Sequence, residues 1–260
     1  VYLIDLYIWG EPILNPQLDQ IIYINHDLGI ASGLSTNLNS IRQLPKVMAA
    51  RPAQLRISMS GASDETYNVT HTGGKWARVE KNLKEVARLR EENGFVTAIE
   101  VYYHLYKHNI EDAKVVKKLC ESNGFSFHPS LAVLFSDYAL QRRKRGIISQ
   151  SADTANELML KSLDELLADC DASGEKNCIL TRVIPVIDWD GTVLSCCNYA
   201  PRQDDKIGAY VDMEFSDLIG RRTSSKTCFE CQSFNLHRWN DQPYYSGYVN
   251  SLIEHDATRP

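Results

Sequence analysis

The first 130 residues alternate short apolar runs with segments in which apolar residues recur every three or four positions. The short runs predict strands over residues 1–8, 30–36, 54–60, 97–105 and 125–129. The segments between them predict amphipathic helices, over 16–28, 41–50, 76–93 and 110–122. Because strands and helices alternate, the pattern predicts an α/β fold with a parallel sheet, and such sheets bind ligands beyond the carboxyl ends of their strands.

Local signals predict where the elements begin and end. Asn15 is a predicted N-cap with Pro16 at the first helical position, and Asn93-Gly94 is a predicted helix end. Residues 131–153 are predicted to be irregular, and residues 155–167 to form one helix. Further on, two apolar runs flank Asp190-Gly191, a pair typical of the type I′ turn of a β-hairpin.

Composition and charge narrow the class of protein. The chain has 260 residues, 43% of them hydrophobic and 23% charged, which is typical of a globular protein. A net charge of −5 and a longest basic run of only Arg142 to Arg145 argue against nucleic acid as a partner. The sequence contains neither a stretch of about 20 apolar residues nor a basic region before an apolar one, so we expect no membrane partner and a cytoplasmic protein.

Polar residues follow each of the predicted strands. Gly10-Glu11-Pro12 follows the first, Ser35 to Asn37 ends the second and Ser58 to Gly61 ends the third. His104 and His128 lie at the ends of the fourth and fifth. A carboxylate among fixed acceptors suits a primary ammonium group. The alternatives remain open that Gly-Glu-Pro is a simple turn, that His104 and His128 are satisfied by the backbone, and that a further histidine, His71, only caps a turn.

These segments resemble the motifs of radical S-adenosylmethionine (SAM) enzymes. Residues 7–16, YIWGEPILNP, are similar to the family's Gly-Gly-Glu-Pro motif, and Ser35-Thr36-Asn37 resembles its Ser-Thr-Asn-Gly segment, with Leu38 in place of glycine. Residues 55–61, LRISMSG, resemble the Ile-Ser-Leu-Asp-Gly strand end, with Ser60 in place of aspartate. The resemblance implies that SAM is bound by Gly10, Glu11, Pro12, Ser35, Asn37, Ser58, Ser60, His104 and His128, with Glu11 at the amino group.

Five of the seven cysteines lie between residues 178 and 231, a clustering that favours metal or iron–sulfur ligation over disulfides. Cys178, Gly191 and Cys196 have the spacing C-x12-G-x4-C, and Cys228 and Cys231 form C-x2-C. Four such thiolates hold either zinc or an iron–sulfur cluster. The layout resembles the twitch form of the SPASM extension, which implies one auxiliary [4Fe–4S] cluster bound by Cys178, Cys196, Cys228 and Cys231. A structural zinc ribbon is the alternative.

The resemblance implies an incomplete, TIM-like (β/α)6 radical SAM barrel over residues 1–150, and a linker helix with a twitch module over 151–260. In the family, a C-x3-C-x2-C loop holds the catalytic [4Fe–4S] cluster, and no three cysteines here have that spacing. We therefore expect the first βα unit and the cluster ligands to lie upstream of Val1, outside this sequence. A degenerate homologue that has lost its radical chemistry is the alternative. No catalytic side chain is assigned.

The implied activity is cleavage of SAM to a 5′-deoxyadenosyl radical, which abstracts a hydrogen atom from the substrate. A carbohydrate-like small molecule is the expected substrate, a ribosomally made peptide is the alternative, and a flavodoxin- or ferredoxin-type protein is the expected electron donor. A non-catalytic or zinc-binding scaffold protein is a further alternative. So is a hydrolase or transferase with a zinc ribbon, although neither a Gly-x-Ser-x-Gly segment nor a phosphate-binding loop occurs in the sequence.

Overall fold

The computed structural model of the chain describes residues 2–133, 137–147, 150–172, 178, 180, 183–199, 205–241 and 244–254. The chain forms two compact units. The first comprises Val1–Ala132 with Tyr245–Pro260, and the second comprises Val133–Tyr244. The segment after residue 137 packs within the second unit, where Arg143 pairs with Asp164.

The first unit is built on a parallel sheet of five strands that follow one another in chain order. The strands are β1 (Leu3–Asp5), β2 (Ala31–Thr36), β3 (Gln54–Met59), β4 (Ala98–Leu105) and β5 (Ser126–Leu131). This confirms the prediction of an α/β fold with a parallel sheet. β1 is shorter than the predicted strand, whose first residue, Val1, lies outside the described residues.

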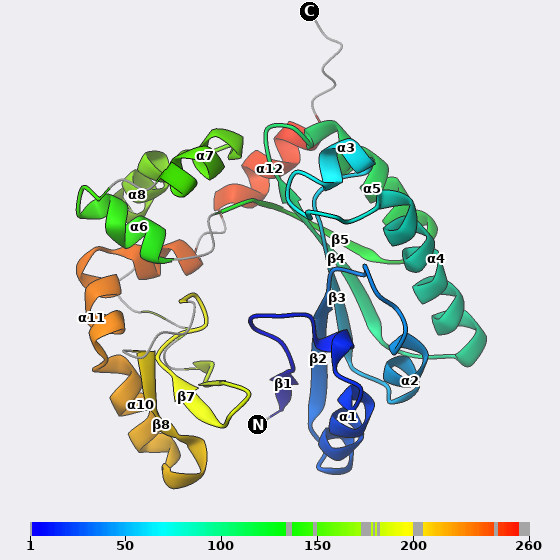
Figure 1. Ribbon diagram of the computed structural model, residues 1–260, viewed down its shortest axis with the longest axis horizontal. Coiled ribbons are helices and arrows are strands. Elements are labelled where there is room, and N and C mark those ends of the chain that lie inside the picture. The colour runs from blue at the N-terminus through cyan, green and yellow to red at the C-terminus, as the bar shows by residue number, and fades with distance from the viewer. Residues whose placement is uncertain are drawn as a thin grey trace, which may run out of the picture. The chain divides into compact units, whose positions relative to one another are not determined.

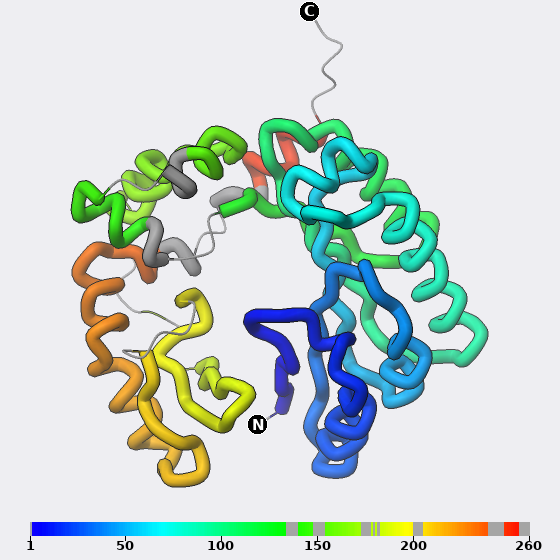
Figure 2. The backbone as a smooth tube through the Cα atoms, in the orientation of Figure 1, coloured from blue at the N-terminus to red at the C-terminus, as the bar shows by residue number. Residues whose placement is uncertain are grey.

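Four helices connect these strands: α1 (Leu18–Asp27), α2 (Leu44–Ala49), α4 (Trp76–Asn93) and α5 (Ile110–Ser122). They lie along one face of the sheet (Figure 1), and Figure 2 shows the chain passing repeatedly between the sheet and this helical layer. Strand–helix–strand crossovers are right-handed, so a strand order that never reverses places every connecting helix on the same side. These four helices therefore leave the opposite sheet face to other groups.

The core of the first unit lies between the sheet and these helices. Leu55, Ile57 and Val101 of the strands and Leu83 and Val116 of the helices are fully buried. Their positions follow the strand period of two and the helical spacing seen in the sequence. This apolar layer holds the carboxyl ends of the strands in fixed positions.

The predicted end of α4 agrees with the structure, whereas the predicted start of α1 does not. α4 ends at Gly94, whose φ of 60° is left-handed, as the Asn-Gly signal predicts. α1 begins at Leu18 rather than at Pro16. The Asn15 side chain accepts a hydrogen bond from the Gln17 backbone N–H at 2.9 Å and so forms a turn ahead of the helix instead of capping its first turn.

The second unit combines helices with a small antiparallel sheet in the order β6-β7-β8. Its main elements are α6 (Asp137–Lys144), α7 (Gln150–Leu158), α8 (Leu163–Ala172), β6 (Val186–Ile187), β7 (Thr192–Leu194), β8 (Lys206–Ala209), α10 (Phe215–Thr223) and α11 (Lys226–Ser233). The prediction that 131–153 is irregular is wrong for α6 and for the start of α7. Residues 134–136 and 148–149 of that segment lie outside the described residues.

The predicted hairpin is present, but its turn differs from the prediction. The Asp188 N–H donates to the Thr192 carbonyl at 2.8 Å, which leaves a loop of three residues. Within this loop Gly191 has a φ of 83°, whereas Asp190 is not among the residues with positive φ. A type I′ turn needs two positive φ angles, so this loop is instead the three-residue kind that ends in a left-handed glycine.

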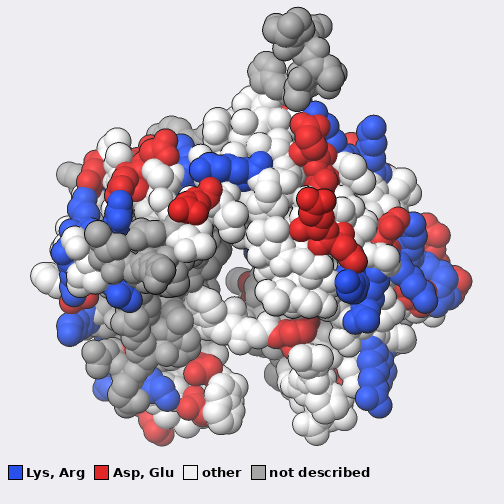
Figure 3. All heavy atoms as spheres, turned by 45° about the horizontal axis from the view of Figure 1, so that its top comes forward, with Lys and Arg blue, Asp and Glu red and all other residues white. Residues whose placement is uncertain are grey.

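The remaining elements are short or peripheral: η1 (Pro12–Leu14), α3 (Asp64–Tyr67), η3 (Tyr210–Asp212), η4 (Leu236–Asp241) and α12 (Tyr244–Glu254). On the face in Figure 3, acidic and basic side chains are intermixed. Among the described helices, none has the length and apolar character needed to cross a bilayer.

Candidate functional site

Glu11 joins the ends of the first two strands. The Asn37 backbone N–H, just beyond β2, donates to Glu11 Oε2 at 2.8 Å. Glu11 Oε1 accepts from the Ile13 N–H at 3.4 Å, which caps the short helix η1. The two segments that resemble SAM-binding motifs are therefore in direct contact, although 26 residues separate them in sequence.

The contacts continue from Asn37 to the end of β3. The Tyr67 hydroxyl donates to the Asn37 carbonyl at 3.3 Å, and the Tyr67 ring stacks on His71 at 4.3 Å between centroids. His71 Nδ1 lies 2.9 Å from Ser60 Oγ, which also contacts the Thr70 hydroxyl. We call Glu11, Asn37, Ser60, Tyr67 and His71 the strand-end cluster.

Burial keeps two members of this cluster neutral near pH 7. It lowers the pKa of His71 and raises the pKa of Tyr67. The histidine then lacks a positive charge and the tyrosine a negative one. Glu11 supplies the charge of the strand-end cluster, and a single carboxylate among neutral groups suits a cationic ligand.

Leu38 stands where the motif that this segment resembles has glycine. Its φ of 56° is left-handed, a conformation that glycine adopts without steric cost. The side chain is fully buried, and Asn82 Nδ2 donates to the Leu38 carbonyl at 2.7 Å. Packing and this hydrogen bond hold leucine in the same backbone conformation.

Asn109 connects the end of β3 to the end of β4, a role that the sequence did not predict. Its side-chain Nδ2 donates to the carbonyls of Ser60, at 2.8 Å, and His104, at 3.0 Å, and Oδ1 accepts from the Tyr106 N–H at 2.8 Å. It precedes α5 directly, but its side chain makes no capping bond to that helix. Only the long-range contacts identify it.

The sheet face opposite the four helices is polar. The Arg56 guanidinium lies 3.6 Å from the centre of the Tyr102 ring, and that ring stacks on His128 at 4.9 Å. Glu100 Oε2 accepts from Gln54 Nε2 at 2.7 Å and lies 3.8 Å from His128 Nε2. We call these five residues the polar sheet face. A parallel sheet covered by apolar layers on both sides needs nearly continuous hydrophobic strands, so this face is built for polar contacts.

Both predicted histidines belong to strands that carry this face. His104 lies near the end of β4, where burial, together with the Arg56 charge, lowers its pKa to about 4. His128 lies in the middle of β5 beside Tyr102, not at the strand end as predicted. The difference arises because β5 continues to Leu131.

The other predicted SAM-binding residues lie around these two groups. Ser35 and Ser58 lie within β2 and β3, where Ser35 pairs with Arg56 and Ser58 with Tyr102. Gly10 is exposed, with a φ of 145°, and Pro12 begins the short helix η1.

The four predicted cysteine ligands all belong to the second unit. Cys178, Cys196, Cys228 and Cys231 are all buried, with 8%, 9%, 5% and 7% of their surfaces exposed. We call them the cysteine site. Cys197 is partly exposed, and a hydrogen bond with Cys196 lowers its pKa. Within the described part of the chain, no three His, Cys, Asp or Glu side chains are arranged to hold one metal ion.

Asp205 connects two segments of the cysteine site and was not predicted. It is 2% exposed, and its Oδ1 accepts hydrogen bonds from the hydroxyls of Ser195, at 3.3 Å, and Thr227. These two residues directly precede Cys196 and Cys228. The carboxylate therefore holds the segment after β7, which carries Cys196, against α11, which carries Cys228.

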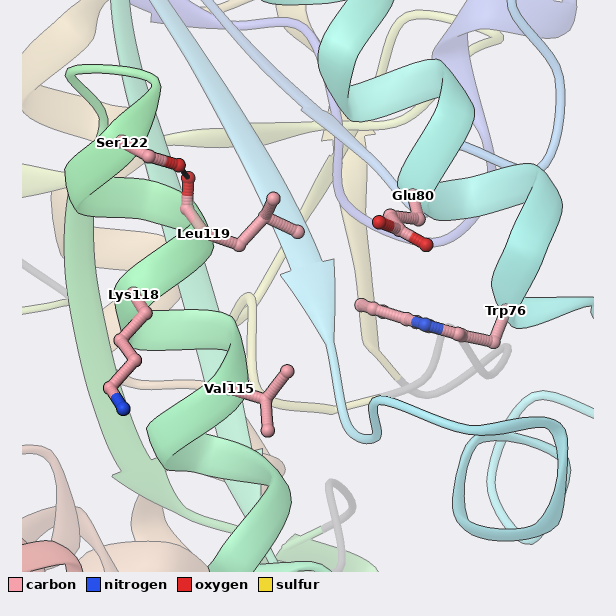
Figure 4. Close-up of a pocket in the computed structure, with 6 residues that line it drawn as sticks. All are labelled: Trp76, Glu80, Val115, Lys118, Leu119 and Ser122. Carbon is pink, nitrogen blue, oxygen red and sulfur yellow. Dashed lines mark hydrogen bonds between the residues drawn. The ribbon is translucent and has the colours of Figure 1, made fainter.

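A groove on the opposite side of the first unit's sheet lies between α4 and α5. In Figure 4, Trp76 and Glu80 of α4 face Val115 and Leu119 of α5 across it, and Lys118 and Ser122 complete the lining. It lies in the helical layer and shares no residue with the strand-end cluster.

No protein-family model and no curated protein matches the sequence. Among solved structures, the chain is similar to Streptococcus suis SuiB bound to precursor peptide SuiA, with 14% identity over 95% of this chain and 64% of that chain and a TM-score of 0.53. It is also similar to native anSMEcpe with bound AdoMet, with 15% identity over 91% of this chain and 70% of that chain and a TM-score of 0.51.

These structures belong to radical SAM enzymes, and the chain shares their fold. The chain covers less than two thirds of the length of several matched structures: 49% and 40% of two TYW1 chains, and 63% of a tagged form of anSMEcpe with bound AdoMet.

Proposed function

We propose that the chain belongs to a radical SAM enzyme and that the strand-end cluster binds the methionine part of SAM. The observation that carries the proposal is the hydrogen bond from the Asn37 N–H to Glu11, because it joins the two motif-like segments at the carboxyl edge of a parallel sheet. Ligands bind at this edge in α/β folds. The shared fold and the order of the strands support a partial (β/α)6 barrel around the site.

The chemistry of the cluster fits a cationic ligand. A carboxylate has about four lone-pair directions, and Glu11 uses one on each oxygen for the Asn37 and Ile13 amides. The remaining lone pairs accept from the ammonium group of SAM. The neutral His71 and Tyr67 add polar atoms without repelling the ammonium or the sulfonium.

In radical SAM enzymes, a reduced [4Fe–4S] cluster supplies the electron that cleaves SAM to methionine and a 5′-deoxyadenosyl radical. The chain itself has no C-x3-C-x2-C segment to hold that cluster. Its residues are proposed to bind and orient SAM and to form one wall of the substrate site. A flavodoxin- or ferredoxin-type protein is the proposed electron donor.

SAM binding tests the proposal. Glu11→Gln keeps the shape of the side chain and removes its charge, so we expect SAM to bind the full-length protein at least about tenfold more weakly, a loss of about 1.4 kcal/mol. Glu91→Gln changes an exposed glutamate near the end of α4 and serves as the matched control. Calorimetry under anaerobic conditions measures both. If Glu11→Gln and Glu91→Gln bind SAM with equal affinity, Glu11 does not contribute to SAM binding.

We further propose that the cysteine site holds one auxiliary [4Fe–4S] cluster in a twitch-type module. Four buried cysteines in one unit are a suitable ligand set. Each thiolate binds a different iron atom in such a cluster, so the four sulfurs lie further apart than around one zinc ion. Iron, sulfide and zinc analysis after anaerobic reconstitution distinguishes the cluster from a zinc ribbon.

The proposed substrate is a carbohydrate-like small molecule. The polar sheet face supports this class, since it offers a carboxylate, a guanidinium and an amide for the hydroxyl groups of a sugar. A peptide is the second candidate, because the similar SuiB structure is bound to a precursor peptide. Formation of 5′-deoxyadenosine by the full-length protein with each class of substrate separates the two.

A further inference from the structure

Arg222 is a buried cation beside the cysteine site. It lies near the end of α10 and is completely buried. Removing a guanidinium from water is costly unless negative charge or fixed acceptors compensate it. The groups around Arg222 therefore indicate the role of its charge.

Two hydrogen bonds of Arg222 lead to the cysteine segments. Nε donates to the Ser195 carbonyl at 3.2 Å, next to Cys196, and an Nη2 donates to the Leu180 carbonyl at 3.4 Å, two residues after Cys178. The guanidinium thus bridges the two cysteine segments that flank the hairpin. Carbonyl oxygens accept its hydrogen bonds but bring no net charge.

Cysteine side chains bring negative charge when they are ionised to thiolates. Cys196, Cys197, Cys228 and Cys178 all lie close enough for their thiolates to interact with the Arg222 charge. Three of these four belong to the cysteine site. An iron–sulfur cluster bound by four thiolates is an anion, and each added electron increases its negative charge.

We propose that Arg222 is a positioning residue that tunes the auxiliary cluster, stabilising its reduced state and so raising its reduction potential. The inference rests on the proposed iron–sulfur centre. Net charge and hydrogen bonding near the sulfurs are two of the factors that set cluster potentials, and a buried cation acts through both in a medium that screens charge weakly. The reduction itself is the gain of one electron by the cluster from an external donor such as dithionite.

The test compares variants of the 260-residue chain, in which no three cysteines have the spacing of the catalytic cluster. Arg222→Gln removes the charge, and Arg222→Lys keeps it but cannot bridge both carbonyls. Arg221→Gln removes the same charge from the exposed neighbour on α10 and is the matched control. Iron and sulfide content is measured after anaerobic reconstitution, and a dithionite titration with mediators, followed by electron paramagnetic resonance, gives the potential.

We expect Arg222→Gln to bind iron like the wild type but with a lower potential. The ratio of reduced to oxidised cluster at a fixed potential should fall about tenfold, which is about 59 mV for one electron. Arg222→Lys and Arg221→Gln should stay close to the wild type. If Arg222→Gln loads iron and keeps the wild-type potential, the inference is overturned and the proposed centre stands.

Other outcomes are also decisive. If the wild-type chain binds no iron, the proposed centre fails and the inference with it. If Arg222→Gln does not fold, Arg222→Met and Arg222→Lys replace it. Iron loading by the lysine variant at the wild-type potential, together with no loading or a lower potential in the methionine variant, supports a role for the charge. If neither Arg222→Met nor Arg222→Lys loads iron, Arg222 is needed for the structure of the site and not for its charge, and the inference is overturned.

Discussion

At the scale of single residues, the candidate site depends on side chains that connect strand ends far apart in sequence. Glu11 and Asn37 could be singled out from the sequence because each follows an apolar run and belongs to a recognisable motif. Tyr67 and Asn109 could not, because their hydrogen bonds reach residues 30 and 49 positions away. A polar residue in a loop gives no local sign of such a partner.

His104 should make stability depend on pH. Its pKa is about 4 in the folded chain, against about 6.5 in an unfolded one. Between these values the unfolded state binds the extra proton, so the free energy of unfolding falls as pH drops from 6.5 to 4 and is unaffected by this group above 6.5. His104→Gln should flatten part of this fall, as urea unfolding at pH 7, 5.5 and 4.5 would measure. Identical pH profiles would contradict the assignment.

Gly61 should not tolerate a side chain. A Cβ there would lie 2.6 Å from the Tyr67 backbone nitrogen and 2.8 Å from Thr66 Oγ1. We expect Gly61→Ala to lower the free energy of unfolding by roughly 1–3 kcal/mol and to displace Tyr67. Gly220→Ala is the control, since no atom lies within 4 Å of its Cβ, and alanine within α10 should be neutral or stabilising. Urea unfolding measures both variants. A larger loss of unfolding free energy in Gly220→Ala than in Gly61→Ala would refute the prediction.

At the scale of elements, the sequence predicted helices well where an apolar stripe was present and missed α6. The α6 sequence, DYALQRRK, has little apolar periodicity. Its stability comes from tertiary contacts: Gln141 donates to the Tyr199 hydroxyl at 2.9 Å, and Arg143 pairs with Asp164 of α8. Such contacts routinely override weak local preference, and no sequence window reveals them.

The single helix predicted over residues 155–167 is two helices in the structure, because a helix start signal lies inside that range. Ser162 and Glu165 form a reciprocal capping box, in which the Glu165 N–H donates to Ser162 Oγ at 3.2 Å and the Ser162 N–H to Glu165 Oε2 at 2.7 Å. This pattern begins α8 at Leu163 and separates it from α7. The Ser-x-x-Glu signal was in the sequence, but the continuing apolar spacing concealed it.

Loss of this cap should weaken the second unit. We expect Ser162→Ala to lower the free energy of unfolding by about 1 kcal/mol, because the Glu165 N–H loses its acceptor. Ser216→Ala, at an exposed position in the first turn of α10, should change stability much less. Thermal and urea unfolding measure both. Equal losses would show that the capping box contributes nothing beyond a generic serine substitution.

At the scale of the whole molecule, the chain separates into a parallel α/β unit and a second unit that contains the cysteine site. The alternation of strands and helices predicted the first, because period and chain order are enough to specify a singly wound sheet. The helical segment from 137 belongs to the second unit, where Arg143 pairs with Asp164 and Lys144 with Asp171.

The cysteine site gives a prediction for the assembled chain. Replacing Cys228 with alanine should abolish or strongly reduce iron binding after reconstitution, because a four-iron cluster requires its thiolate ligands. Cys120→Ala removes a buried cysteine of α5 in the first unit and should leave the iron content unchanged. Iron and sulfide assays on both variants decide this. Full iron loading of Cys228→Ala would exclude Cys228 as a ligand.

The sequence by itself determined the kinds of element, their order, and which residues end the strands or form the cysteine spacing, because period, turn residues and motif spacing are local properties. The tertiary structure decided which of those residues meet. The contact between Glu11 and Asn37, the bridges made by Asn109 and Asp205, and the burial of Arg222 exist only once distant segments pack together. Long-range hydrogen bonds and buried charges depend on that packing, which no short stretch of sequence encodes.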